Sequence, residues 1–262
     1  MVTGSSLVND YILLNVVTTR DNVPVILPSW TLENSPFDLA VNDLTLAQLQ
    51  GILSRDNKRK APPESEEEAA AEAAKSSSLV TLEQALTTID PNVGICLELT
   101  YPSDAEIFQM RTGSLPDPNL LVDTILMTIF ATTGTLESRS LMFCSANPQL
   151  CLITNLKQPN FPVMFRTFAG LHKHPTDARC NSIQQAVRFS KAANLLGIVC
   201  EATSLIDVPA LITTMKEEGL IVASFGDLNL DQANVKLQES AGVDAVAVGN
   251  KIQVVRASQQ WF

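Results

Sequence analysis

The chain has 262 residues, of which 45% are apolar and 18% charged, enough apolar content for one large domain or two small ones. Its net charge of -10 and sequence pI of about 4.7 exclude nucleic acid as the main partner, because phosphate backbones are bound by basic surfaces. We see no apolar run of the ~18 residues that a membrane span needs, and no signal peptide. We therefore expect an intracellular protein of the cytoplasm, the nucleus or both.

Two short apolar runs, at residues 11–17 and 23–27, come first and are separated by the turn sequence Arg20-Asp21-Asn22. Both are typical of strands. Residues 55–78 then form a low-complexity segment with no aromatic residue and no aliphatic residue larger than Ala or Pro. Such a segment buries too little apolar area to offset the entropy of ordering, so we expect a disordered insert within a single domain that spans residues 1–262.

From residue 93 onward, continuous apolar runs alternate with segments of helical period, which is typical of βαβ units and a parallel sheet. With the strands before the insert, this rhythm predicts a (β/α)₈ TIM-like barrel that is one strand short at its N-terminus. A doubly wound open sheet is the alternative, but no strand is followed by a GxGxxG turn. The predicted strands lie at 93–99, 141–144, 162–165, 196–200, 220–224 and 243–248, and the predicted helices at 119–131, 148–156, 182–196, 208–217 and 230–238.

The polar residues that end these strands are the candidate site residues, because a TIM barrel carries its site at the carboxyl ends of its strands. Glu98, Glu201 and Asp227 could hold Mg²⁺ or Ca²⁺ through oxygen ligands, or be structural acids instead. Arg166 could bind a phosphate or form an ordinary ion pair. The only histidines, His172 and His174, could supply a general acid or lie on a solvated loop. The five cysteines form no CxxC pair, so they predict neither a zinc site nor a disulfide framework.

Several segments together resemble the glycerophosphodiester phosphodiesterase family. The stretch VTTRDNVPVI resembles the hairpin of that family, VTLEQAL resembles its TLEEVL helix, and LELTYP resembles the end of its EIKYP strand. The C-terminal half is similar to the fungal branch, above all to the C-terminal domain of SPX–ankyrin–phosphodiesterase regulators of phosphate signalling. The resemblance implies a place at the C-terminus of a longer protein and, through that protein, a cyclin–kinase complex as partner.

The same resemblance implies a barrel enzyme that cleaves glycerophosphodiesters to an alcohol and glycerol 3-phosphate. Such enzymes use two histidines for proton transfer and a divalent cation, Mg²⁺ or Ca²⁺, held by three carboxylates. In this chain the paired acids of the family fall on Leu13 and Asn15, and the catalytic His-Asp falls on Pro28 and Ser29. The third acid is kept as Glu98, whereas the lysine that follows it falls on Thr100.

These replacements predict a degenerate, non-catalytic domain that acts in phosphate-responsive signalling as an interaction or ligand-sensing module. We predict no cofactor, and we expect phosphate or a glycerophosphodiester as the possible ligand. The alternative is an active phosphoric diester hydrolase in lipid metabolism that uses substitute groups, with Glu98, Glu201 and Asp227 around a cation and His172 or His174 as the acid. Convergence of the three acids on one coordination sphere would favour that alternative.

Overall fold

The computed structural model describes residues 10–32, 39–59, 79–102, 107, 115–132, 139–171 and 177–255. The chain divides into two compact units. The first unit comprises residues 1–15, 90–111 and 134–262, and the second comprises residues 16–89 and 112–133. Each is described by itself, and all candidate ligand contacts fall in the first.

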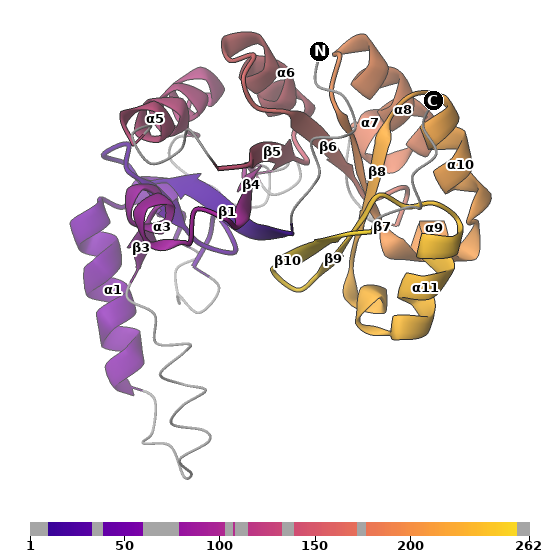
Figure 1. The fold of residues 1–262 in the computed structure, drawn as a ribbon. Helices are drawn as coiled ribbons and strands as arrows, with labels where there is room; N and C mark the ends of the chain where they lie inside the picture. The colour runs from indigo at the N-terminus through magenta and orange to yellow at the C-terminus, as the bar shows by residue number, and fades with distance from the viewer. Residues whose placement is uncertain are drawn as a thin grey trace. The chain divides into compact units, whose positions relative to one another are not determined.

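The first unit is built around a closed sheet of eight strands (Figure 1). Neighbouring strands from β4 to β9 are parallel, and β1 pairs with β4. The (β/α)₈ class predicted from the alternation of strands and helices is therefore confirmed. The strands are β1 (Tyr11–Thr18), β4 (Gly94–Leu99), β5 (Leu141–Ser145), β6 (Val163–Thr167), β7 (Gly197–Glu201), β8 (Ile221–Phe225), β9 (Ala245–Val248) and β10 (Lys251–Val254).

Strand β10 closes the barrel at the place where the sequence analysis expected a strand to be missing. It pairs antiparallel with β9 and also antiparallel with β1, where Tyr11 lies opposite Ile252. A backbone hydrogen bond of 2.8 Å from the Leu13 N–H to the Asn250 carbonyl supports this closure. The barrel is thus completed by a strand of opposite direction from the C-terminal end of the described chain.

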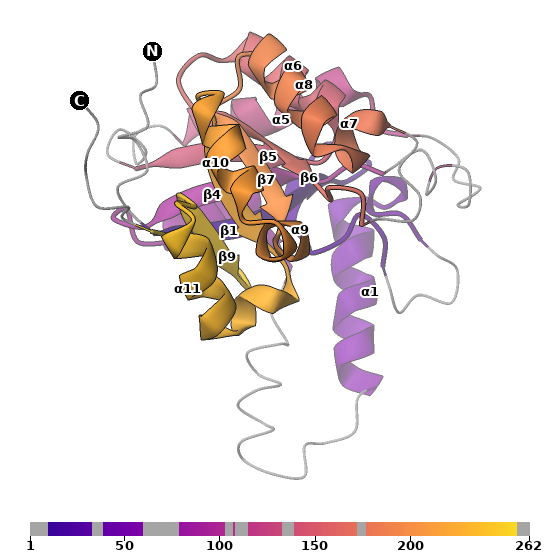
Figure 2. The ribbon, with the colours of Figure 1, turned by 90° about the vertical axis from the view of Figure 1, so that its right-hand side faces the viewer.

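Helices cover the outer face of this sheet (Figures 1 and 2). Helix α6 packs on β5 and β6, α8 on β6 and β7, and α10 on β8. Local caps fix where several of them begin: the Asn147 side chain accepts hydrogen bonds at the start of α6, and Asp231 does so for α11. The helices of this unit are α6 (Pro148–Lys157), α7 (Ala178–Asn181), α8 (Ile183–Ala192), α9 (Ala202–Asp207), α10 (Ala210–Glu217) and α11 (Gln232–Ser240).

The barrel interior is filled by apolar side chains from every strand. Successive side chains of a strand point to opposite faces, so each strand contributes every second residue. We call the resulting set the apolar layer, and Leu13 and Phe225 pack against it while remaining partly exposed. Its buried members are Tyr11, Cys96, Met142, Cys144, Met164, Val199, Ala223, Ala245, Ala247 and Ile252.

The second unit holds the end of β1 with the short strands β2 (Pro24–Ile26) and β3 (Val80–Thr81), in antiparallel pairs. Helix α3 (Leu82–Thr88) packs on β2 and on α5 (Pro118–Ala131). Helix α1 (Leu46–Arg59) includes the first residues of the predicted insert, so those residues are helical. The rest of the insert, 60–78, lies outside the described residues. Among the helices of the described ranges, none has an apolar run of the length that crossing a bilayer requires.

Candidate functional site

A polar layer follows the apolar layer toward the carboxyl ends of the barrel strands. Side chains two residues apart on a strand point to the same face. Because Cys96, Met164 and Val199 point into the barrel, the residue two positions after each of them points inward as well. The same holds for Leu13 on β1 and Ala223 on β8. We call this set the mouth layer, and it comprises Asn15, Glu98, Arg166, Glu201 and Phe225.

An ion pair joins two of these side chains. The Nη1 atom of Arg166 donates a hydrogen bond to the Oε1 atom of Glu98. The Glu98 side chain is only 9% exposed and that of Arg166 is 23% exposed, so the pair is largely withdrawn from water. A charge-assisted hydrogen bond in such surroundings is among the stronger polar contacts of a protein. The Glu98 carboxylate is therefore already engaged within the chain.

Two aromatic rings hold the guanidinium in this position. Its central carbon lies 3.9 Å from the ring centroid of Phe225 and 5.4 Å from that of Phe168. The two rings also contact each other edge to face, with centroids 5.7 Å apart. Ring faces attract a cation, and Arg is suited to this stacking. The Nε atom of Arg166 in this layer and the Oγ1 atom of Thr100, just after β4, are buried without a hydrogen-bond partner, which leaves unused hydrogen-bonding capacity.

Glu201 is used for a different purpose. Its carboxylate caps helix α9, accepting hydrogen bonds of 2.8 Å from the Thr203 backbone N–H and 3.2 Å from the Thr203 hydroxyl. Gly226 lies beside it with φ of +123°, and a Cβ at that position would come within 2.6 Å of the Glu201 Oε1 atom. The positive φ favours glycine here, and a Cβ would also oblige the Glu201 carboxylate to move.

The cation site of Glu98, Glu201 and Asp227, which the hydrolase alternative would need, does not form among the described residues. Asp227 is exposed at the start of a short 3₁₀ helix, Asp227–Leu230. Among the described residues, no three His, Cys, Asp or Glu side chains are grouped so that they could hold a metal ion. Two unit charges 4 Å apart interact by roughly 4 kcal/mol at an effective dielectric constant of about 20, so a dication near Arg166 would meet about twice that repulsion. These residues do not fit a divalent cation.

The other positions singled out by the resemblance offer little chemistry. Leu13 packs against the apolar layer and has no oxygen on its side chain, and Asn15 contributes an uncharged amide. Pro28 is exposed, and the Ser29 hydroxyl lies 3.2 Å from that of Thr31; both belong to the second unit. His172 and His174 lie outside the described residues.

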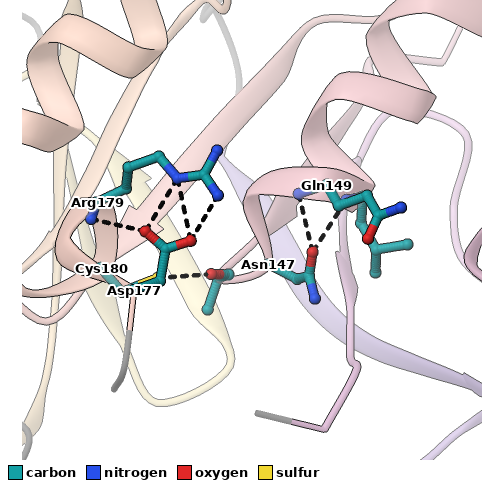
Figure 3. Close-up of polar contacts among 7 residues, drawn as sticks. Asn147, Gln149, Asp177, Arg179 and Cys180 are labelled. Carbon is teal, nitrogen blue, oxygen red and sulfur yellow. Dashed lines mark hydrogen bonds and ion pairs between the residues drawn. The ribbon is translucent and has the colours of Figure 1, made fainter. Parts of the chain in front are cut away.

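The described residues that follow β5 and those that begin α7 form a rim, in which polar groups are paired internally (Figure 3). Asn147 caps α6, and Asp177 caps α7 while also binding Arg179 through Nε and Nη2. The hydrogen bonds from the Arg179 side chain lower the pKa of the Asp177 carboxyl. The Cys180 thiol lies 3.2 Å from the Ala146 carbonyl oxygen. These contacts engage the polar groups of the described part of the rim, whereas both histidines of the chain lie in residues 172–176, outside the described residues.

Two cysteines of the barrel strands, Cys144 and Cys200, are not activated nucleophiles. The pKa of the Cys144 thiol is raised well above its ordinary value by a hydrogen bond with Cys96, by burial and by the charge of Glu98. Burial raises the pKa of Cys200 to about 12. Thiols of this kind stay protonated at neutral pH and behave as small apolar side chains.

Glu98 and Arg166 were separate candidates in the sequence, and an ion pair was open for Arg166, but neither Glu98 as its partner nor the two phenylalanines were predicted. The alternation in the strand sequences VMFRT and IVASF was the available signal, because it points Arg166 and Phe225 to the inside. Strand neighbours, however, become known only with the register. Arg166 lies opposite Val199, and Glu201 lies opposite Phe225.

An eight-stranded α/β barrel with its polar layer at the carboxyl ends of the strands defines a TIM-type domain. Residues 6–250 match the family model described as the Glycerophosphoryl diester phosphodiesterase family. The chain belongs to this family, and the resemblance drawn from its sequence is confirmed.

Fungal relatives are similar over most of this chain. The glycerophosphocholine phosphodiesterase GDE1 of Candida albicans is 32% identical over 97% of this chain and 26% of its own length. The gde1 protein of Schizosaccharomyces pombe is 31% identical over 96% of this chain and 25% of its own length. The ankyrin repeat protein nuc-2 of Neurospora crassa is 29% identical over 84% and 25%. The chain thus spans about a quarter of the length of these relatives.

Solved structures show the same fold. A phosphodiesterase from Oleispira antarctica, crystallised with sn-glycerol-3-phosphate, is 16% identical and has a TM-score of 0.61 over 93% of this chain and 82% of its own. A glycerophosphodiester phosphodiesterase from Agrobacterium tumefaciens gives a TM-score of 0.54 at 15% identity, over 90% and 82%. At such identities the likeness concerns the barrel alone.

Proposed function

We propose that this domain is a non-catalytic member of the family that recognises a phosphate or glycerophosphodiester ligand at the mouth layer and serves phosphate-responsive signalling. The observation that carries the proposal is the engagement of Glu98 by Arg166, in a barrel where, by the resemblance, Leu13 and Asn15 stand at the positions of the other two acids. Arg166 keeps donors for an anion, because a guanidinium has five N–H groups. Its role as a phosphate contact is part of this proposal.

The cost of the replacements supports the absence of turnover. Loss of one general acid or base lowers a rate by typically ~10² to 10⁴. Pro28, at the position of the catalytic histidine, has no proton to transfer, and Ser29 cannot replace a carboxylate. The combined loss of proton transfer and of metal charge leaves no useful hydrolysis by the family's mechanism.

The second candidate is the hydrolysis of glycerophosphodiesters, and the comparisons favour it over the non-catalytic role. Three of the curated relatives most similar to this chain are named glycerophosphocholine phosphodiesterases. A hydrolase would need substitute groups, and the three acids once considered for this are not grouped in the described residues. Signalling and a cyclin–kinase partner would belong to a longer protein and are supported only by the resemblance.

A direct assay separates the two candidates. The purified chain is incubated with glycerophosphocholine and either Mg²⁺ or Ca²⁺, and the release of glycerol 3-phosphate is measured beside the Glu98→Gln variant. Glu239→Gln, which changes an exposed acid on α11, is the matched control. We expect no release above background from any of the three. Release that Glu98→Gln abolishes and Glu239→Gln keeps would establish the hydrolase instead.

The ligand part of the proposal has its own test. Calorimetric titration with glycerol 3-phosphate, in the presence of EDTA, should give heat of binding that Arg166→Met removes. Equal binding by the original chain and by Arg166→Met, or no heat of binding in either, would show that Arg166 is not the anion contact.

A further inference from the structure

We infer that Arg166 permanently takes the place of a divalent cation, so that the mouth layer carries a built-in positive charge instead of an exchangeable metal. The inference concerns the same layer as the proposed function and rests on it only in taking Glu98 as a position where the family would bind its cation. It begins from charge. Within the described part of the mouth layer, the acid that Arg166 contacts is Glu98, and the neighbouring acid Glu201 is committed to capping α9.

A divalent cation needs several oxygen ligands, usually with carboxylates among them. On β1 the chain offers Leu13, which has none, and Asn15, which has a neutral carbonyl oxygen. A metal at Glu98 would therefore take the place of the guanidinium, and the single carboxylate would then have to balance the two positive charges of the metal. It would also have to displace Arg166 or lie beside it, and both positive charges would then compete for one carboxylate.

The rings make the guanidinium the better occupant. Phe225 and Phe168 flank Arg166 within cation–π range, and this contact is available to a flat, weakly hydrated guanidinium. A hydrated Mg²⁺ ion keeps its water and gains little from a ring face. The side chains around Glu98 are thus arranged for Arg166 rather than for a metal.

One consequence separates this arrangement from a metal site. A bound metal leaves when a chelator is added, whereas the guanidinium of Arg166 is covalently part of the chain. The charge of the mouth layer, and any anion binding that depends on it, should therefore be independent of divalent cations.

Manganese binding tests the inference. Mn²⁺ is titrated into the chain and followed by electron paramagnetic resonance, which counts free Mn²⁺ directly. We expect no Glu98-dependent binding up to about 1 mM in the original chain, and binding at least about tenfold tighter in Asn15→Asp/Arg166→Met, where one acid is restored and the guanidinium removed. The matched control is Asn15→Asp/Lys191→Met, which removes an exposed positive charge from α8 and should bind no better than the original.

Two results would overturn the inference. One is Mn²⁺ binding by the original chain that Glu98→Gln abolishes, and the other is a folded Asn15→Asp/Arg166→Met variant that gains no affinity over the control. If that variant fails to fold, thermal unfolding of the original chain decides: the midpoint should be the same in EDTA and in 5 mM Ca²⁺ or Mn²⁺ to within about 1 °C. A rise of several degrees that Glu98→Gln removes would contradict a built-in cation.

The outcome is distinguishable from that of the proposed function. Glu98-dependent Mn²⁺ binding without release of glycerol 3-phosphate would overturn the inference and leave the non-catalytic role standing. Hydrolysis that persists in EDTA would overturn the non-catalytic role and leave the inference about Arg166 standing.

Discussion

The apolar layer and the mouth layer of the barrel are built by the same alternation of side chains along the same strands, yet they differ in how they are held together. In the apolar layer Met142, Met164 and Ala223 are each buried to 95% or more and contribute no charge. In the mouth layer the next inward residues include a carboxylate and a guanidinium. One layer gains from the removal of apolar area from water, the other from the mutual satisfaction of polar groups.

The difference indicates which residues of the barrel can be substituted without loss of the fold. Apolar packing tolerates little loss of volume, so the deeper layer holds the barrel together. Polar groups near the mouth can be exchanged if their charges remain balanced, as Glu98 and Arg166 balance each other. A barrel can therefore keep its fold while the groups at its mouth take on another role.

The largest effect is expected from Gly197→Ala, on the strand face that carries Val199 of the apolar layer. A Cβ at Gly197 would come within 2.0 Å of the Ile221 backbone carbonyl oxygen on the neighbouring strand, and backbone cannot move away as a flexible side chain can. Overpacking of this kind lowers the free energy of unfolding by about 4 kcal/mol or more. Urea unfolding followed by circular dichroism measures it, and an unchanged midpoint would contradict the close approach.

A matched glycine provides the control. Gly51 lies exposed in helix α1, and nothing lies within 4 Å of the Cβ that alanine would add. Because glycine weakens a helix interior relative to alanine, Gly51→Ala should raise the free energy of unfolding by up to about 1 kcal/mol. We therefore expect the same glycine-to-alanine substitution to lower the free energy of unfolding at Gly197 and to raise it at Gly51.

Met142→Ala is the next largest change and tests the apolar layer itself. Met142 is 2% exposed and packs among the inward side chains of neighbouring strands. Its truncation removes buried apolar area and leaves a cavity, which lowers the free energy of unfolding by about 3 kcal/mol. The exposed Met127→Ala on α5, where the side chain is 71% exposed, should change it by less than about 0.5 kcal/mol. Equal losses in the two variants would refute the layer as described.

The Glu98–Arg166 pair tests the mouth layer and should give a smaller effect. Glu98→Gln leaves the guanidinium without its counter-ion, but the Arg166 side chain is 23% exposed, so water screens part of the cost. We expect a loss of about 1–2 kcal/mol in the free energy of unfolding. Glu98→Gln/Arg166→Met should cost about 1 kcal/mol less than the sum of the single changes. If the loss in the double variant equals the sum of the losses in Glu98→Gln and Arg166→Met, the two side chains are not coupled.

The barrel could be predicted from the sequence because its parallel strands are continuous apolar runs. Strand β10 escaped prediction because Lys251 and Gln253 alternate with Ile252 and Val254 in a short segment, and because its place depends on pairing with β1, more than 200 residues earlier in the chain.

The sequence indicated which polar residues belong to the site, but it did not indicate which of them contact one another. Glu98 and Arg166 are 68 residues apart, and only the register of the strands brings them together. The acid cluster of the hydrolase alternative does not form for a local reason, because the Glu201 carboxylate accepts a hydrogen bond from the backbone N–H of Thr203, two residues later. Asp, Asn, Ser and Thr are the usual helix caps, so a glutamate at this position gave little warning.

The smallest effect concerns the rim, where the pair of Asp177 and Arg179 links the start of α7 to its own first turn. Hydrogen bonds from Arg179 lower the pKa of Asp177 below its ordinary value of 3.8, so this carboxylate stabilises the folded state above about pH 4 and ceases to do so as pH falls through its folded pKa. Asp177→Asn keeps a helix cap but loses the charge, and should cost about 0.5 kcal/mol at pH 7, since both side chains are partly exposed. Urea unfolding of both proteins at pH 7 and near pH 3 measures the difference, which should shrink at the lower pH. In an Arg179→Met background the dependence on pH should largely disappear, whereas a difference that persists unchanged at low pH would assign the effect to the cap alone.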